Sequence, residues 1–279
     1  MYRVADPPTA MVNRTAETPS FARTLGGLRR YRHLLRNLVF KDLKLKYRGS
    51  VIGFLWSLAN PLLMTAIYTL AFRTIMQQRG EGFVFFLMLG LLSWTYFSSS
   101  AAMSTGSIAD NGGLVKSVWF PRAILPTATV LFNLVQYLLT VMVFLPVILL
   151  YFHVPLVLPM LLFPVFVVMQ TAFTIGVALI LSTSSAFFRD VRHLVEIALV
   201  VLFWTTPIVY SLETPPPVVA QVLRFSPLTP FVSAYQEIFY YRRWPDTTLW
   251  ATASAYTVIA LAVGLWLIVR YEDAFAERI

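Results

Sequence analysis

The sequence predicts an all-α, polytopic membrane protein with six transmembrane helices, an N-terminal amphipathic helix at the membrane surface, and short helices on the external side. Three observations lead to this fold class. The 279 residues are 58% hydrophobic and only 13% charged, whereas soluble domains carry about 25% charged residues. The mean hydropathy is +0.69. The apolar residues form long continuous runs, not the alternating segments of about ten residues that build an outer-membrane barrel.

The chain begins with a segment that lacks hydrophobic periodicity. Residues 1–25 are rich in Thr, Ala and Pro, and we expect a mobile cytoplasmic tail there. Residues 26–48 differ, because most of their apolar side chains fall on one arc of a helical wheel and most of their cations on the other. This composition is typical of a helix that lies on anionic lipid, so we expect a basic interfacial helix.

A transmembrane domain of six helices is expected over residues 49–279. Its first span, residues 51–72, contains no Asp, Glu, Lys or Arg and includes Asn60-Pro61. As a helix it would rise about 33 Å, enough to cross a hydrocarbon core of about 30 Å. The cations directly before this span place its start in the cytoplasm.

The middle of the chain predicts three further spans. We expect the second span at 83–106 and a cytoplasmic loop at 107–122. The next 66 residues, 123–188, carry no charged side chain, which fits two spans that turn on the external side at 153–155. Polar residues at membrane depth usually face other helices or a water-filled cavity. Those within these two spans are Asn133, Gln136 and Gln170.

The last third of the chain predicts two spans and an external segment. A cytoplasmic turn, FRDVRH at 188–193, precedes the fifth span at 194–212. Residues 213–246 form an external segment with two amphipathic helices that are too short to cross a membrane. The sixth span is expected at 247–269, before a short cytoplasmic tail. The two external helices are expected at 218–225 and 231–241.

The distribution of cations supports this topology. Of the 22 Lys and Arg residues, 17 fall in segments predicted to be cytoplasmic and 5 in segments predicted to be external. This is the positive-inside pattern, and it places both termini in the cytoplasm. The net charge of +9 need not indicate nucleic acid, because 11 of the cations precede residue 49, next to a span. Lipid headgroups are the simpler partner.

Motifs for catalysis or metal binding are absent from the sequence. There is no cysteine, and the three histidines, at 33, 153 and 193, form no metal-binding pattern. GxxxxGK[ST], GxSxG and HExxH do not occur. The spans carry no series of acidic residues for proton coupling. We therefore expect no catalytic residue and no cofactor in this chain, and a pathway driven by a gradient or by another chain.

Four stretches closely resemble the membrane subunit of ABC-2-type polysaccharide exporters, which include the O-antigen and teichoic-acid export permeases. They are GFLWSLANPLLMTAIYTLAF (53–72), WFPRAILPTATVLFNLV (119–135), FFRDVRHLVEIALVVLFWTTPIVY (187–210) and RFSPLTPFVSAYQEIFY (224–240). The resemblance implies a six-span homodimer around a central channel in the cytoplasmic (inner) membrane. Two copies of a separate cytoplasmic ATPase, which would bind ATP and Mg, would drive export. The substrate would be an O-antigen, teichoic acid or galactan linked to a polyprenyl diphosphate.

The resemblance also implies roles for segments of this chain. The loop 107–122 would carry the coupling helix, the FRDVRH turn would be a second ATPase contact, and 213–246 would be a pair of external gate helices. The residues expected at the ATPase contact are Asn111, Lys116, Phe120, Arg122, Arg189, Asp190 and Arg192. Cations of the basic helix would collect the diphosphate headgroup, because Lys and Arg pair strongly with phosphate. These are Arg29, Arg30, Arg36, Lys46 and Arg48.

A glycan channel would be lined by aromatic rings, which stack on the C–H faces of sugars and keep a polar edge. The candidates are Tyr68, Trp94, Tyr96, Phe97, Tyr137, Trp204 and Tyr210. Simpler interpretations stay open for each group: aromatic residues also pack in cores and anchor spans at interfaces, and cations also set topology or bind bulk lipid.

Two other functions remain as alternatives. One is an ABC-2 permease for a drug or another small lipid, although the basic helix and the FRDVRH and PLTPF stretches favour the polysaccharide branch. The other is a membrane glycosyltransferase, which needs acidic residues near the membrane surface. Its internal candidates are Asp110, Asp190 and Glu196, and no two of them form a DxD pair.

Overall fold

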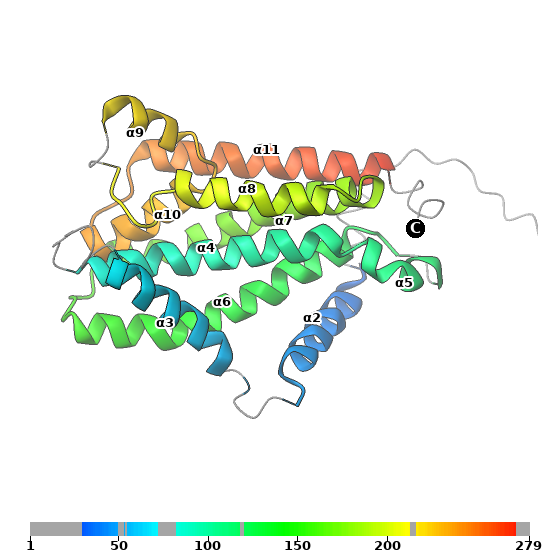
Figure 1. Ribbon diagram of the computed structural model, residues 1–279, viewed down its shortest axis with the longest axis horizontal. Coiled ribbons are helices and arrows are strands. Elements are labelled where there is room, and N and C mark those ends of the chain that lie inside the picture. The colour runs from blue at the N-terminus through cyan, green and yellow to red at the C-terminus, as the bar shows by residue number, and fades with distance from the viewer. Residues whose placement is uncertain are drawn as a thin grey trace, which may run out of the picture.

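The computed structural model describes residues 30–49, 53, 55–71, 82–117, 120–212 and 216–271, and in these residues all regular structure is helical (Figure 1). The α-helices are α2 (Arg32–Tyr47), α3 (Leu55–Thr69), α4 (Phe83–Gly106), α5 (Gly112–Ser117), α6 (Ile124–Tyr151), α7 (Phe163–Phe187), α8 (Val191–Thr205), α9 (Pro217–Arg224), α10 (Thr229–Tyr235) and α11 (Thr247–Tyr271). Two 3₁₀ turns, η2 (Ala109–Asn111) and η3 (Leu158–Leu162), and a π-helical turn, η4 (Gln236–Tyr241), complete the list.

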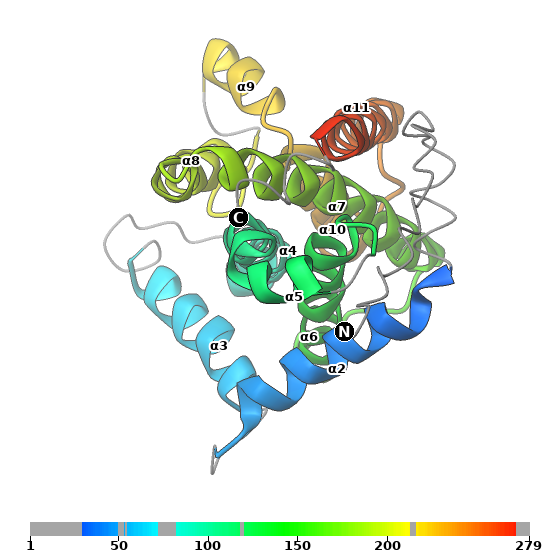
Figure 2. The same ribbon diagram turned by 90° about the vertical axis from the view of Figure 1, so that its right-hand side faces the viewer.

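Helix α4 is the centre of the bundle. It packs against α3, α6, α7 and α8, and these helices surround it when the bundle is viewed end-on (Figure 2). A helix that is apolar on every face is stable only when other apolar surface covers it. In agreement, most of α4 is buried inside the protein. The predicted span at 83–106 has the same bounds as α4.

Four helical segments are long and apolar enough to cross a membrane: α4, α6, the continuous run Leu158–Phe187, and α11. A helical protein with several apolar spans is therefore confirmed. The predicted first and fifth spans correspond to α3 and α8, which have only 15 residues each. A helix of that length rises about 22 Å, so the number of six complete crossings stays a prediction.

Helix α8 ends seven residues before the predicted end of the fifth span. Its C-cap, Thr206, has an extended backbone (φ −102°, ψ 136°), because the ring of the following Pro207 disfavours the helical conformation at the residue before it. The turn between α6 and α7 contains residues 153–155, and the two short helices expected at 218–225 and 231–241 correspond to α9 and to α10 with η4.

The closest helix crossing in the bundle lies between α7 and α11. Gly176 on α7 faces Ala260 and Gly264 on α11, and a Cβ atom at Gly176 would lie 2.5 Å from the backbone nitrogen of Leu261. Small residues allow such backbone contact, which is a common basis of helix association in membranes.

The polar residues expected to face other helices do so. Gln170 on α7 is fully buried and bridges two neighbours: its side-chain oxygen accepts from Tyr235 Oη at 2.8 Å, and its Nε2 donates to the carbonyl of Ser93 at 3.1 Å. Asn133 donates to Met103 Sδ on α4 at 3.6 Å and to the carbonyl of Thr129 on its own helix, and Gln136 accepts a hydrogen bond from Lys46 on α2. The oxygen or nitrogen of each buried amide therefore has a partner, although Gln136 Nε2 is buried without one among the described residues.

The N-terminal helix α2 differs in one respect from the expectation. Its apolar face, with Leu38 and Val39 buried, packs against α6 and the segment around Phe120. Most of the apolar arc therefore meets protein and not lipid. Phe40 and Leu45, both more than half exposed, remain on the outside with the cations. An interfacial position of α2 stays a prediction.

Candidate functional site

Four of the seven aromatic candidates gather where α3, α4 and α8 meet. They surround Phe203: Tyr68 stacks on its ring at 5.5 Å, and Trp94 and Trp204 each meet it edge-on at 5.4 Å. Tyr210 donates to the carbonyl of Trp204 at 2.7 Å. We call these five residues the aromatic cluster.

The aromatic cluster presents rings at the surface of the protomer. Trp204 is 54% exposed, and Tyr68, Trp94 and Tyr210 are partly exposed. Phe203, which holds them together, is almost fully buried. Sequence reasoning missed Phe203, because one apolar residue in an apolar helix carries no distinguishing signal.

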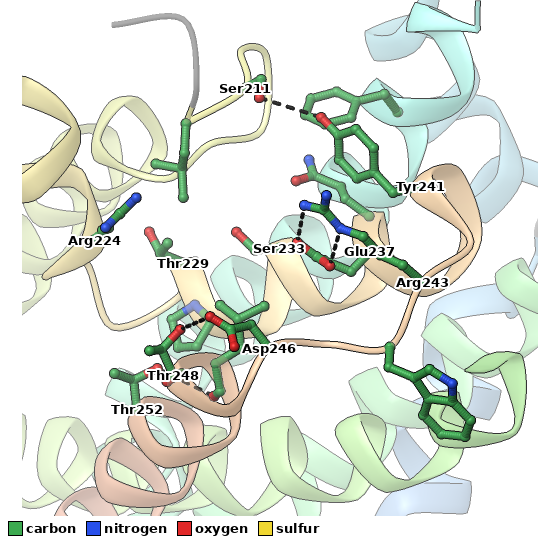
Figure 3. A pocket seen from close by; sticks show the side chains of 16 residues that line it. Ser211, Arg224, Thr229, Ser233, Glu237, Tyr241, Arg243, Asp246, Thr248 and Thr252 are labelled. Atoms are coloured by element: carbon green, nitrogen blue, oxygen red, sulfur yellow. Dashed lines mark hydrogen bonds and ion pairs between the residues drawn. The ribbon is translucent and has the colours of Figure 1, made fainter. Parts of the chain in front are cut away.

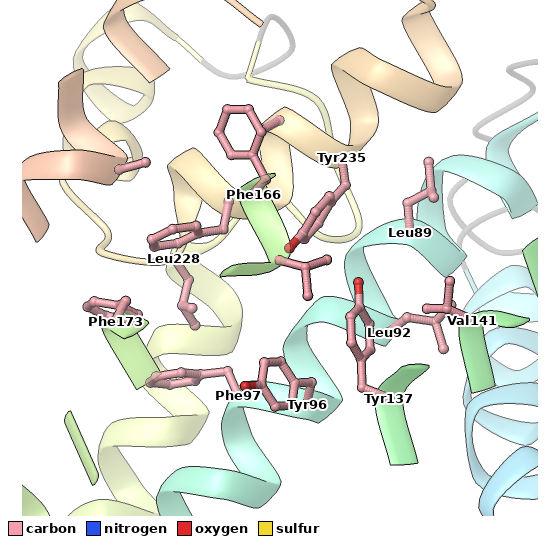
Figure 4. Close-up of a cluster of buried hydrophobic side chains, with 14 of the residues drawn as sticks. Leu89, Leu92, Tyr96, Phe97, Tyr137, Val141, Phe166, Phe173, Leu228 and Tyr235 are labelled. Atoms are coloured by element: carbon pink, nitrogen blue, oxygen red, sulfur yellow. The ribbon is translucent and has the colours of Figure 1, made fainter. Parts of the chain in front are cut away.

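The other three aromatic candidates lie in the core. Tyr96, Phe97 and Tyr137 are at most 6% exposed, and Figure 4 shows them packed among buried side chains of the bundle. Tyr96 stacks on Tyr137 at 5.1 Å and donates to Thr171 Oγ1 at 3.1 Å. In this conformation these rings hold α4, α6 and α7 together and are not accessible to a polymer.

The two predicted cytoplasmic loops lie together at the α5 end of the bundle. Arg192, in the first turn of α8, donates to Asp110 Oδ1 in η2 at 2.5 Å. The pair crosses Gly106, where a Cβ atom would lie 2.9 Å from Arg192 Nη2. The structure therefore joins residues 82 positions apart into one surface, and sequence reasoning did not assign Asp110 to it.

The residues expected at the ATPase contact are split between surface and interior. Lys116, Arg189, Asp190 and Arg192 are exposed, and Asn111 is partly exposed. Phe120 and Arg122 are buried, with the Arg122 guanidinium over the Phe120 ring at 5.2 Å. In this conformation Phe120 and Arg122 pack the loop against the protein.

The cations of α2 occupy two kinds of position. Arg30, Arg36 and Arg48 are exposed, and Arg29 lies outside the described residues. Lys46 is exposed along part of its side chain as well, but its ammonium group donates to Gln136 Oε1 on α6. Burial lowers the pKa of the Lys46 ammonium group, because desolvation disfavours its charged form.

A cavity of about 540 Å³ lies at the end of α2 and is lined by three cations, Lys41, Lys44 and Arg48. Only Arg48 was a sequence candidate. Residues 41, 44 and 48 are spaced by three and four positions, so they share one helix face. That spacing is the signal that would have identified Lys41 and Lys44 with it.

No group of three or more metal-ligating side chains occurs among the residues that the structure describes. The bundle and its long apolar helices define a polytopic helical membrane protein.

Comparison with known proteins agrees with this class. The profile of the ABC-2 type transporter family matches residues 33–240. The chain is 36% identical over 254 residues to the O-antigen export system permease protein RfbA of Myxococcus xanthus. The aligned region covers 90% of this chain and 97% of that protein. Two proteins of the same name from Klebsiella pneumoniae are each 33% identical, over 74% of this chain and 80% of their own length. The chain belongs to the ABC-2 type transporter family.

Proposed function

We propose that this chain is the membrane permease subunit of an ABC transporter that exports a polysaccharide, carried on a polyprenyl diphosphate, across the cytoplasmic membrane. A separate ATPase subunit supplies the energy. The observation that carries the proposal is the 36% identity to an O-antigen export permease over nearly the whole of both chains. The exposed aromatic cluster gives that likeness a physical counterpart in this structure.

The surface at the α5 end is the proposed ATPase contact. Helix α5 is the coupling helix in this proposal, and the Asp110–Arg192 ion pair holds its loop against the start of α8. Lys116, Arg189 and Asp190 are exposed beside it. Complementary charges on a partner fix register and orientation across such a surface. Copurification with an ABC ATPase, reduced by charge reversal at Lys116 and Arg189, is the expected result.

The proposed path for the glycan runs over the aromatic cluster, between two copies of this chain. Helices α3 and α8, which flank the cluster, both expose large apolar side chains, such as Leu63, Ile67, Ile197 and Val200. A second copy placed against these helices would cover them and would bring two aromatic clusters to opposite sides of one path. The proposal of a homodimer is therefore supported by the exposed apolar side chains of α3 and α8, which lie next to the aromatic cluster.

The cavity at the end of α2 is the proposed site for the lipid diphosphate. Lys41, Lys44 and Arg48 place three cations around about 540 Å³, and guanidinium and ammonium groups form charge-assisted hydrogen bonds to phosphate oxygens. Substitution of Lys44 and Arg48 by Gln is expected to reduce export and to leave the amount of protein in the membrane unchanged. Unchanged export would remove the headgroup site from the proposal.

The six-span topology with both termini inside is testable directly, because the natural chain contains no cysteine. Single cysteines at Ser117, the last residue of α5, and at Val218, in α9, are expected to react with a membrane-impermeant maleimide from opposite sides. Reaction of both from the same side contradicts the topology.

The central test of the proposed function is deletion in the native host. We expect the lipid-linked glycan to accumulate inside the cell and to disappear from the surface, and we expect a plasmid copy to restore it. Unchanged surface glycan in the deletion strain refutes the proposal. Transport by the purified chain in liposomes, without any ATPase, refutes the assignment of the energy source.

A further inference from the structure

A cavity at the α9 end of the bundle, lined by both polar and apolar side chains, has no role in the proposed function. It measures about 750 Å³, within the range of about 300–1,000 Å³ that is usual for ligand pockets. Figure 3 shows charged and hydroxyl side chains around it. They come from the end of α9, from α10 and η4, from the start of α11, and from residue 211 after α8.

Among the described residues, the charges that line this cavity sum to zero. Arg243 is bound by Glu237 through two hydrogen bonds, Nε to Oε2 at 2.6 Å and Nη2 to Oε1 at 2.7 Å. Asp246 is occupied as the cap of α11, accepting from Thr248 Oγ1 at 2.8 Å. Arg224 remains, and it makes no hydrogen bond or ion pair with another described residue. A balanced lining, with one guanidinium that no described residue binds, suits an uncharged ligand rich in acceptors more than a phosphate.

The wall opposite Arg224 is held in place by an unusual backbone. The π-helical turn η4 ends at Arg242, which adopts a left-handed conformation at φ 57°. The Glu237 carbonyl accepts the backbone N–H of both Arg242 and Arg243, and its carboxylate binds the Arg243 side chain. π-Helical turns and left-handed non-glycine residues are frequent at functional sites, since they require supporting contacts.

The remaining lining fits a sugar. Ser233 and Thr229 on α10 carry hydroxyl groups, and the Tyr241 ring lies under the Arg243 guanidinium at 4.8 Å. A guanidinium offers five N–H donors in a planar fork, which matches two neighbouring hydroxyl oxygens of a pyranose. Aromatic rings provide the apolar contact that the C–H face of a pyranose needs.

We propose that this cavity is a saccharide-binding site, which holds one or two neutral sugar residues of the glycan next to the aromatic cluster. Ser211 of the cavity directly follows Tyr210 of the cluster, so the two surfaces are adjacent in the chain. Arg224 is the principal donor, and Glu237 and Arg243 form the rigid wall. This proposal rests on the proposed export function and names where the polymer is held at the α9 end.

The test measures saccharide binding to the purified full chain in lipid nanodiscs by saturation-transfer difference NMR. The probes are neutral hexoses, the delipidated polysaccharide of the native host, and glycerol 3-phosphate. We expect saccharide signals with the natural chain, and we expect Arg224→Gln to weaken saccharide affinity by about tenfold or more, the loss typical of one charge-assisted group. Ser233→Leu, which fills the cavity from α10, is expected to abolish binding.

Gln221→Ala is the control, because it changes an exposed polar side chain of α9, the helix of Arg224, that does not line the cavity. Its saccharide affinity should equal that of the natural chain. Three outcomes would each overturn the proposal. The natural chain binds no saccharide, it binds glycerol 3-phosphate in preference to sugars, or Arg224→Gln binds saccharide with the affinity of the natural chain. The deletion strain separates the two ideas: if surface glycan is lost on deletion while these variants bind normally, only the saccharide site fails.

Discussion

The contact between α7 and α11 leads to a quantitative prediction for Gly176→Ala. The added Cβ atom would lie 2.5 Å from Leu261 N, where ordinary contact begins at 3.4 Å. The atoms that block it belong to the backbone, so no side chain can rotate away. Helices α7 and α11 must separate by about 0.9 Å, and a gap of about 0.5–1 Å forfeits a quarter to a half of each contact energy. Overpacking of this kind costs about 1–3 kcal/mol.

Gly113→Ala is the matched control for this substitution. Gly113 lies in α5 with open space where its Cβ would be. Alanine raises helix propensity by about 1 kcal/mol at either position, so the difference between the two variants isolates the steric effect. Thermal unfolding of both proteins in the same detergent is the assay, with a shift of about 2–4 °C for each kcal/mol. We expect Gly176→Ala to unfold several degrees below Gly113→Ala. Equal midpoints would refute the backbone contact as a source of stability.

Three further predictions concern charge and aromatic contacts. Either D110R or R192D alone should reduce export, and the double variant, which exchanges the two charges, should restore it. Because both side chains are about half exposed, each single change should cost only about 0.2–1 kcal/mol of stability. A loss of folded protein in a single variant would contradict this estimate. Trp204→Ala should reduce export, whereas Trp266→Ala, at a similarly exposed tryptophan of α11, should not. Equal export by the two variants would show that the aromatic cluster does not line the path of the glycan. A hydrogen bond from the Thr248 side chain lowers the pKa of Asp246. Its carboxylate therefore stabilises the fold above an unfolded pKa of about 3.9, and this contribution is lost as the pH falls through the lowered pKa. Asp246→Ser, whose hydroxyl does not titrate, should show a smaller fall of the unfolding midpoint between about pH 5 and 3 than the natural chain in the same thermal assay.

The elements were predictable where composition alone decides them. A long run without charged residues predicts an apolar helix, and the bounds of α4 agree with the prediction to the residue. The end of α8 was also readable in principle, because Thr206 precedes a proline and the helix stops there. The length of the apolar run outweighed that local signal.

For the central helix α4, the sequence could not predict which face lies in the protein core and which face contributes to an exposed surface. Because α4 is apolar on all sides, its sequence has no polar face that would identify a lining surface. Tyr96 and Phe97 were therefore indistinguishable from Trp94 in the sequence, although the structure places the first two in the core and the third in the aromatic cluster. Long-range pairs such as Asp110–Arg192 have no sequence signal at all, since they depend on how α8 returns beside η2.

Gly106 connects the charged loop surface to the centre of the bundle, and its substitution is the most direct test of coupling. It is the last residue of α4, and only a residue without a Cβ leaves room for the Asp110–Arg192 pair that crosses it. Because packed interiors transmit displacement, a partner that moves α5 would move α8 through this pair and α4 through the chain itself. Trp94, Phe203 and Trp204 of the aromatic cluster lie on those two helices. Gly106→Ala should therefore match Asp110→Asn in effect: export falls while the ATPase of the assembled complex continues to hydrolyse ATP. If Gly106→Ala exported glycan at the natural level, the Asp110–Arg192 pair would not be needed to transmit movement of α5 to the aromatic cluster.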